Sequence, residues 1–185
     1  MRTKRFYSTP ALIRMFKSQI LSYIEGATPA IYHASPSTLD LLDSVFHNFL
    51  LDMNLSIEQA LVDYDLAPLG MRRDIAMLGL LWKVSRKLAP GPIQSLFSLH
   101  GNTLLHYGFN INTELHDYQI SDPVEVGHPT IIRRSIFGLV RIWNLLPRAM
   151  VRAPSVKAFQ RLLQNQAKVA AEHCSLNWDL MYHAN

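Results

Sequence analysis

The stretch Arg133–Leu163 reads RRSIFGLVRIWNLLPRAMVRAPSVKAFQRLL, and the rest of the chain is interpreted outward from it. Apolar residues recur in its first half every three or four positions, which is the spacing of one helical face. Pro147 ends that helix, because proline cannot donate to the helical ladder and disfavours helix at the residue before it. Pro154 and Ser155 then begin a second helix. The sequence therefore predicts two helices joined through Pro147 and Pro154.

Each of these helices has an apolar face. The first face consists of Ile132, Ile136, Leu139, Trp143 and Leu146, and the second of Val156, Phe159, Leu162 or Leu163, Gln166 and Val169. We expect Trp143 and Phe159 to be buried and to pack together, which stabilises the fold by about 2–3 kcal/mol for each ring. Asn144 is an expected helix end, because asparagine tolerates left-handed backbone angles and bonds local backbone groups.

The same region is strongly basic. Residues 133–168 contain eight Lys or Arg and no Asp or Glu. Such a run can bind phosphates in a salt-dependent way, form a solvated face, or dock on an acidic partner. The candidate nucleic-acid contacts are Arg133, Arg134, Arg141, Arg148, Arg152, Lys157 and Arg161.

Charge is also unevenly distributed over the whole chain of 185 residues, whose net charge is +4. Residues 1–17 carry five basic groups and no acid, whereas residues 18–132 hold five basic and twelve acidic residues. Two arrangements follow from this distribution. Either the basic ends meet the acidic middle within the fold, or both ends face a polyanion.

The length fits one large domain or two small ones, and an apolar content of 49% is enough for a core. Cys174 is the only cysteine, which excludes an internal disulfide and a cysteine-rich zinc site. A single thiol fits a reducing intracellular compartment, cytoplasmic or nuclear. Since no apolar run is long enough for a membrane-spanning helix, we expect no membrane association.

Further helices are expected in residues 1–99. Thr9–Pro10, Ser35–Pro36 and Pro68 are helix start signals, and Ser56 with Gln59 has capping-box spacing. The apolar stripes after these signals are Leu12, Ile13, Phe16, Ile20, Tyr23 and Ile24; Leu39, Leu42, Phe46, Phe49, Leu50 and Met53; and Ile75, Leu78, Leu81, Trp82, Ser85 and Leu88. A short helix is expected over 93–99.

The sequence thus predicts an all-α fold, an irregular bundle of about six to seven helices with a long irregular loop near 100–132. We expect one domain overall, with an N-terminal helical part at 1–99, the loop or linker at 100–132, the basic helix pair at 133–173 and a tail at 174–185.

No reaction centre is expected. His100, His106, His116 and His128 lie 6, 10 and 12 residues apart, which is not the paired spacing of metal ligands, so we expect surface histidines and no metal. Asp63 and Asp65 point about 200° apart on a helix and cannot converge on one ion. His173 and Cys174 are adjacent and do not face each other. No nucleophile elbow, phosphate-cradling loop or dinucleotide fingerprint occurs. We therefore predict no enzyme and no cofactor; an enzyme built on the histidine loop is a third, weaker hypothesis.

Three blocks of the basic region form an ordered set. They are Arg133-Arg134-Ser135, then Trp143-Asn144-Leu145-Leu146-Pro147, then the helix from Ser155 to Phe159. This order, a basic helix, an aromatic-Asn-x-Leu-Pro element and a Ser-x-x-x-Phe helix, resembles the C-terminal region of reverse transcriptases from non-LTR (LINE-like) retrotransposons. The residues that carry the motif are Trp143, Asn144, Leu146, Pro147, Ser155 and Phe159.

Upstream blocks extend the resemblance over nearly the whole chain, in the same order. Ile24–Tyr32 looks like the family's Leu-Glu-Tyr-Ala-Ser-Pro-Val-Trp element, and Leu66-Ala67-Pro68-Leu69 fits the block that precedes a long helix. The helix from Thr38 to Met53 departs from the family pattern, since His47 and Asn48 stand where the family has a basic pair.

The family's polymerase turn, Tyr/Phe-Ala-Asp-Asp, has no counterpart here, nor do its endonuclease domain and Cys/His knuckle. The resemblance therefore implies a non-catalytic fragment from beyond the palm and fingers, beginning at an internal Met1, with the remainder of a parent polymerase as a partner. It also implies weak, sequence-independent binding of RNA or DNA through the basic C-terminal face. The alternative function is a helical protein-interaction module with no nucleic-acid role.

Overall fold

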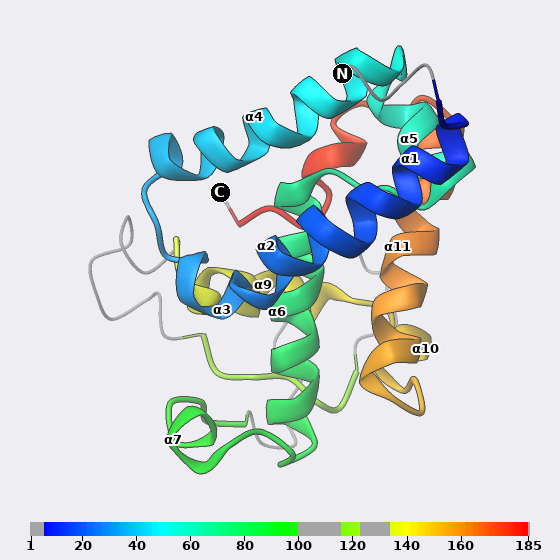
Figure 1. Ribbon diagram of the computed structural model, residues 1–185. Coiled ribbons are helices and arrows are strands. Elements are labelled where there is room, and N and C mark those ends of the chain that lie inside the picture. Colours follow the sequence, from blue (N-terminus) through cyan, green and yellow to red (C-terminus); the bar gives the residue numbers. More distant parts are fainter. Residues whose placement is uncertain (1–5, 100–115, 123–133, 185) are drawn as a thin grey trace. The chain divides into compact units, whose positions relative to one another are not determined.

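The computed structural model describes residues 6–99, 116–122 and 134–184, and the structural statements below refer to these ranges. The described residues confirm the predicted all-α fold class (Figure 1). The extended contact among them is one antiparallel bridge between Leu99 and Ile120. In the same ranges, no helix has both the length and the apolar composition needed to cross a membrane.

The chain forms two compact units. Unit 1 comprises residues 1–73 and 166–181, and unit 2 comprises residues 74–165 and 182–185. Each unit therefore combines residues from the expected N-terminal part at 1–99 with residues from the expected basic helix pair at 133–173.

Unit 1 begins with one nearly continuous helix whose middle is a π-helix. This helix consists of α1 (Thr9–Met15), η2 (Phe16–Leu21) and α2 (Ser22–Gly26). Three further helices of unit 1 follow it, namely α3 (Thr28–Ile31), α4 (Pro36–Met53) and α5 (Ile57–Tyr64). The expected apolar stripe is wrong at Ile20 and Tyr23, which are 39% and 82% exposed, whereas Leu21 is buried. A π turn contains one residue more than an α turn, so the residue that follows Phe16 on the buried face is Leu21, five positions later.

The predicted helix starts of α4 and α5 are confirmed. The Ser35 side chain accepts a hydrogen bond from the amide of Thr38, and Ser56 and Gln59 form a complete capping box. Apolar side chains of α1, α4 and α5 share one core, in which the rings of Phe16 and Phe49 stack with centroids 4.0 Å apart.

The helices that contribute to unit 2 are α6 (Leu69–Ser85), α7 (Gly91–Gln94), η4 (Ile136–Gly138), α9 (Leu139–Leu145), α10 (Arg148–Val151) and α11 (Val156–Glu172). Helix α6 ends at Ser85, earlier than expected, and Lys87 adopts a left-handed conformation that leaves Leu88 exposed. The short helix expected over 93–99 is mostly wrong, because the helix found there, Gly91–Gln94, covers only its first two residues and Leu99 forms the bridge to Ile120.

The buried face of α11 is only partly the expected one. Phe159, Leu163 and Ala167 are fully buried at intervals of four, whereas Leu162 and Val169 are 39% and 52% exposed. The buried face of α11 therefore includes Ala167, whereas the more apolar Val169 lies outside it. Within unit 2, α11 packs closely on α6, since a Cβ atom at Gly79 would lie 2.5 Å from Nε2 of Gln160 (Figure 1).

Candidate nucleic-acid interface

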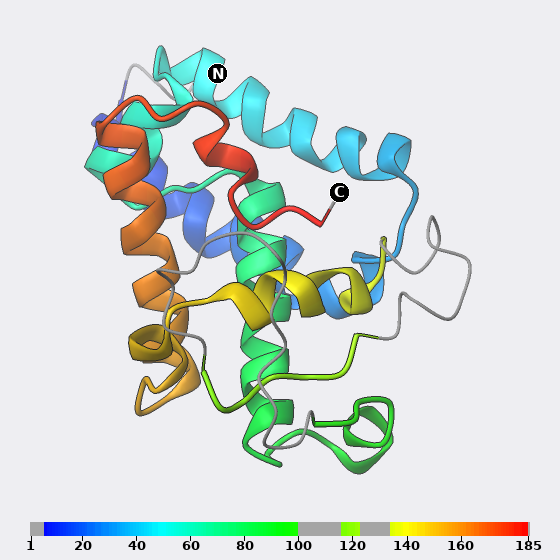
Figure 2. The same cartoon turned by 180° about the vertical axis from the view of Figure 1, so that it is seen from behind.

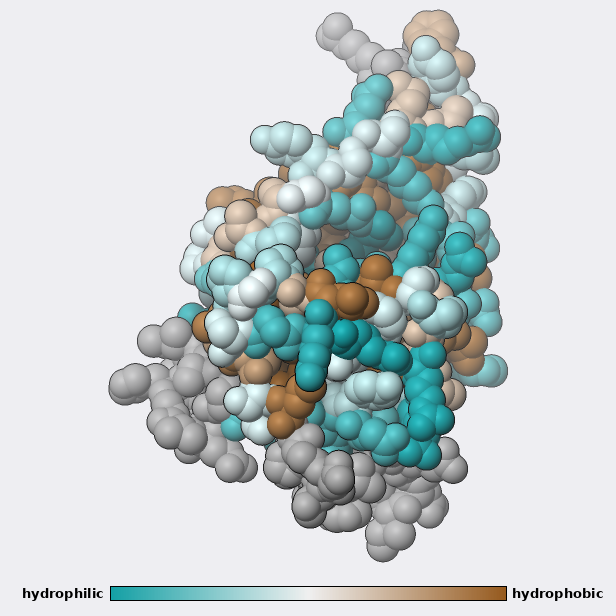
Figure 3. All heavy atoms as spheres, turned by 90° about the horizontal axis from the view of Figure 1, so that it is seen from below, coloured by the Kyte–Doolittle hydropathy of each residue, from teal (hydrophilic) through white to brown (hydrophobic). Residues whose placement is uncertain are grey.

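The structure places six of the seven candidate contacts, and Arg133 lies outside the described residues. Arg134 is exposed in the turn before η4, and Arg141 is exposed on α9. Arg148 begins α10 and Arg152 follows its last residue, while Lys157 and Arg161 are exposed on α11. On the face drawn in Figure 3, hydrophilic side chains, in teal, are interspersed with hydrophobic ones, in brown.

The motif residues around these cations form a packed scaffold, as expected. Trp143 and Phe159 are fully buried, and their rings meet edge to face with centroids 5.7 Å apart. Leu146 is buried beside the turn at Pro147, which is the N-cap of α10. Ser155 caps α11, because its Oγ accepts a hydrogen bond of 3.1 Å from the amide of Ala158.

The expected role of Asn144 as a left-handed helix end is wrong. Asn144 lies within α9, and Leu146 ends the helix with extended backbone angles. The buried Asn144 side chain instead bonds a distant backbone: Oδ1 accepts from the amide of Ile120 at 2.9 Å, and Nδ2 donates to the carbonyl of Ile120 at 2.8 Å. A neighbouring β-strand would offer the same donor and acceptor. The side-chain amide of Asn144 therefore takes the place of a strand and provides hydrogen-bond partners for both backbone groups of Ile120.

Trp143 holds the same segment at Tyr118, two residues before Ile120. Its indole Nε1 donates to the carbonyl of Tyr118 at 2.8 Å. Figure 2 shows residues 116–122, in yellow-green, running beside α9, in yellow, in agreement with these bonds. Two side chains of one motif therefore fix the path of a segment that the sequence alone does not place.

His116 is fully buried, so the expectation of a surface histidine is wrong at this position. Its Nδ1 accepts from the amide of Tyr118 at 3.2 Å, which places the proton on Nε2, and Nε2 donates to the carbonyl of Trp143 at 2.8 Å. Burial lowers the pKa of His116 from its ordinary value of 6.5, although the bond to the Trp143 carbonyl opposes the change. His100, His106 and His128 lie outside the described residues.

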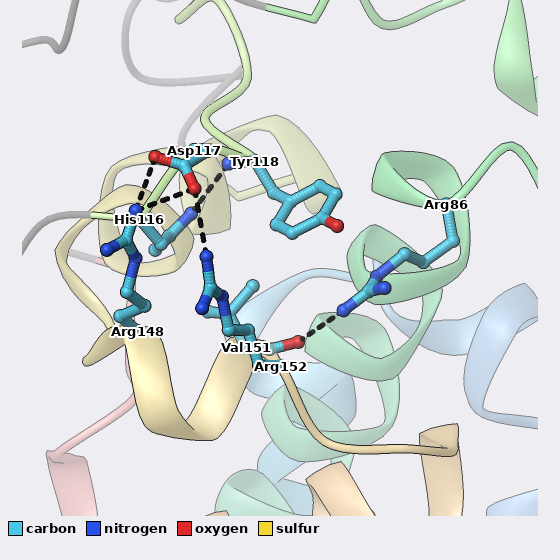
Figure 4. A network of polar contacts seen from close by, with 7 residues as sticks. All are labelled: Arg86, His116, Asp117, Tyr118, Arg148, Val151 and Arg152. Carbon is cyan, nitrogen blue, oxygen red and sulfur yellow. Dashed lines mark hydrogen bonds and ion pairs between the residues drawn. The ribbon is translucent and has the colours of Figure 1, made fainter.

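These contacts present Asp117 to the cations of α10. Nη2 of Arg148 donates to both carboxylate oxygens, at 2.8 and 2.7 Å, and Nη2 of Arg152 donates to Oδ2 at 3.3 Å (Figure 4). The hydrogen bond from Arg148 holds the pKa of Asp117 below its usual value, and Arg152 adds to the effect. Arg148 and Arg152, two of the candidate nucleic-acid contacts, thus both bind a carboxylate of the same chain.

Arg86, in the turn directly after α6, supports this arrangement. Its guanidinium lies 4.2 Å from the centre of the Tyr118 ring, and Nη2 donates to the carbonyl of Val151 at 3.1 Å (Figure 4). Trp82 donates to the same carbonyl at 3.1 Å. The last turn of α10 is therefore anchored to α6 through Trp82, and both this turn and the segment that bears Asp117 contact Arg86 just beyond α6.

Sequence reasoning missed Asp117, Tyr118 and Arg86. Asp117 meets Arg148 and Arg152 across 31 and 35 positions of sequence, so no local pattern connects them. The excess of acids in residues 18–132 indicated that the basic ends could pair with this middle part of the chain. It did not indicate which acid would pair with which arginine.

The described part of the chain contains no group of three or more His, Cys, Asp or Glu side chains that could hold a metal ion. Asp65 is the left-handed C-cap of α5 and pairs with Lys168 in unit 1. Cys174 is exposed just beyond α11.

Comparisons of the chain with protein-family models, with curated proteins and with solved structures found no match. The grounds for a functional proposal are therefore the geometry above and the order of the sequence blocks.

Proposed function

We propose that this chain is a non-catalytic region of a reverse-transcriptase-like protein that holds RNA or DNA through phosphate contacts, without reading its sequence. The phosphate contacts come from the basic segment between Arg134 and Arg161. The proposal includes no catalytic step, because it assigns the chain a position beyond the polymerase palm.

One observation carries this proposal. Lys157 and Arg161 lie one turn apart on the exposed side of α11, and neither makes an ion pair or hydrogen bond with another described residue. The sequence provides no acid between residues 133 and 168 that could neutralise them. Exposed cations at this spacing are free to contact successive phosphates, and such contacts depend on salt but not on base sequence.

The packing of the motif residues supports the resemblance to the C-terminal region of non-LTR reverse transcriptases, because it gives these residues a role in the local fold. Trp143, Asn144 and Phe159 are all buried, and their contacts join α9 to α11 and to residues 118–120. A motif whose side chains face one another in a core specifies a local fold, and the fold then leaves the arginines outside.

The test is a titration of a labelled oligothymidylate at several salt concentrations. The variant Lys157→Gln/Arg161→Gln is expected to weaken binding and to reduce the slope of log K against log salt by about 1.4, since each phosphate contact on a single strand contributes about 0.7. The matched control is Lys83→Gln/Lys87→Gln, which removes the same charge from exposed positions outside both basic regions.

Equal losses in the two double variants would show that only net charge matters and would contradict the proposed contacts. Binding without a salt slope, or no binding at low salt, would exclude the nucleic-acid role altogether.

A second candidate function has its own observation. Asp117, from the acidic middle of the chain, pairs with Arg148 and Arg152, as expected if the basic face docks on acidic surfaces. We infer a helical interaction module as the alternative. Charge reversal at Arg133 and Arg141 separates the two functions: loss of fold stability favours self-docking, and loss of RNA binding alone favours the nucleic-acid role.

A further inference from the structure

Arg148, Arg152 and Asp117 form a cluster of two cations and one anion on the surface of unit 2. The side chains are 38%, 56% and 54% exposed, respectively. Exposed ion pairs contribute little to stability, so this cluster is not explained by a need to hold the fold together. Its larger effect is on what the two guanidinium groups are able to bind.

The two residues that flank Asp117 in sequence are anchored independently of the ion pairs that its carboxylate makes. His116, on one side of Asp117, is buried and bonded to the carbonyl of Trp143. On the other side of Asp117, the backbone carbonyl of Tyr118 accepts a hydrogen bond from the indole N–H of Trp143, and the guanidinium of Arg86 lies over the Tyr118 ring. Because both neighbours are anchored, Asp117 has a high effective concentration beside α10 and needs little ordering to bind there.

The contacts within the cluster are those that a phosphate would make. One nitrogen of Arg148 spans two oxygens at 2.8 and 2.7 Å, and Arg152 reaches one of these oxygens at 3.3 Å. Arginine binds carboxylates and phosphates through the same donors, and a phosphate brings more charge and a third oxygen. With one carboxylate against two guanidiniums, the cluster also keeps an excess of one positive charge.

We propose that Arg148 and Arg152 form a phosphate-binding site and that Asp117 occupies this site in the free protein. The ligand is a phosphate group of a polyanionic backbone, so the inference deepens and rests on the proposed nucleic-acid function. Asp117 is then an internal competitor that lowers the affinity of the basic segment, and phosphate must displace it before both arginines are engaged.

The decisive variant is Asp117→Asn, which keeps the shape of the side chain and removes its charge. It is expected to bind the oligothymidylate about tenfold more tightly than the wild type at low salt, with a slope steeper by about 1.4 for two released cations. The matched control is Asp40→Asn, because Asp40 is exposed on α4 in unit 1 and gives the same change in net charge.

A second substitution identifies the released cations. Arg152→Gln is expected to reduce affinity more in the Asp117→Asn background than in the wild type, where Asp117 already engages Arg152. A structural role of Asp117 alone would give the same loss in both backgrounds. Circular dichroism confirms folding, and Asp117→Ser replaces the asparagine variant if the latter does not fold.

Inorganic tripolyphosphate separates this inference from the proposed function. A larger rise in the melting temperature of Asp117→Asn than of Asp40→Asn, without oligonucleotide binding by any variant, would support the phosphate site and contradict the nucleic-acid role. Equal responses of the two variants to both probes would overturn the phosphate site, whatever the wild type binds.

Discussion

Asn144 links two parts of the chain with one side chain. Its amide gives a partner to the N–H and to the C=O of Ile120, a residue with no exposed surface. Buried backbone groups cost free energy when they lose their partners, and no other bond is recorded for these two groups among the described residues. The aromatic-Asn pair in the motif is therefore explained by hydrogen bonding as well as by packing.

Asn144→Ala is expected to lower the free energy of unfolding by about 2–4 kcal/mol, because it leaves a buried donor and a buried acceptor unsatisfied. Urea denaturation followed by circular dichroism measures the change. Asn165→Ala, at an exposed position of α11, is the control and is expected to stay within about 0.5 kcal/mol of the wild type. Equal effects of the two substitutions would contradict the role assigned to Asn144.

His116 makes stability depend on pH. Burial lowers the pKa of the folded-state imidazole below 6.5, its ordinary value and that expected in the unfolded chain. As pH falls below 6.5, the unfolded state takes up a proton that the folded state refuses, so the free energy of unfolding decreases towards acid pH. Between pH 7 and pH 5 the wild type is expected to lose stability more steeply than His116→Asn in urea titrations.

The control for this titration is His47→Asn, because His47 is exposed on α4. It is expected to keep the steep loss of stability seen in the wild type. If the free energy of unfolding of His116→Asn fell with decreasing pH as steeply as that of the wild type, groups other than His116 would cause the acid sensitivity.

At the scale of whole elements, the features that were predictable are local. The starts of α4 and α5 follow from serine caps within a few residues, and the separation of α9 from α11 follows from Pro147 and Pro154. The short helix α10 between the two prolines was not expected. The π-helix η2 was not predictable, because Ile20 and Leu21 are equally apolar and only the packed core decides which one is buried.

Capping of α11 gives a prediction at this scale. Ser155→Ala is expected to lower the free energy of unfolding by about 1 kcal/mol, since it removes the acceptor for the amide of Ala158. Ser155→Asp retains an acceptor and places negative charge at a helix start, so it is expected to preserve stability. Chemical denaturation of both variants checks the difference, and a loss as large in the aspartate variant would argue against capping.

The candidate site was predictable only as a list of cations. Composition identified Lys157 and Arg161, because an acid-free run is visible in the sequence. Composition did not separate them from Arg148 and Arg152, whose shared partner is placed by Trp143 and the rest of unit 2. Which charges are available is decided by contacts between residues distant in sequence, and these have no local signature.

For the molecule as a whole, the number of basic residues overstates how many cations are available to a partner. Unit 1 pairs Arg72 with Glu25, Arg73 with Asp43 and Lys168 with Asp65, and unit 2 pairs two arginines with Asp117. Part of the basic excess in the C-terminal region therefore meets the acids of residues 18–132, as one of the two arrangements expected from the sequence requires. The remaining cations determine how strongly a polyanion binds.

This accounting predicts the salt dependence of the wild type. If all seven candidate cations contacted phosphate on a single strand, log K would fall against log salt with a slope of about −4.9. With Arg148 and Arg152 held by Asp117, the slope is expected to be shallower than this value by at least about 1.4, and it is expected to steepen by about 1.4 in Asp117→Asn. Fluorescence anisotropy of a labelled oligothymidylate across a salt series measures both slopes. A wild-type slope near −4.9 would mean that all seven cations contact phosphate and would contradict the withholding of Arg148 and Arg152 by Asp117. A slope near zero would mean that the exposed arginines and Lys157 do not bind phosphate at all.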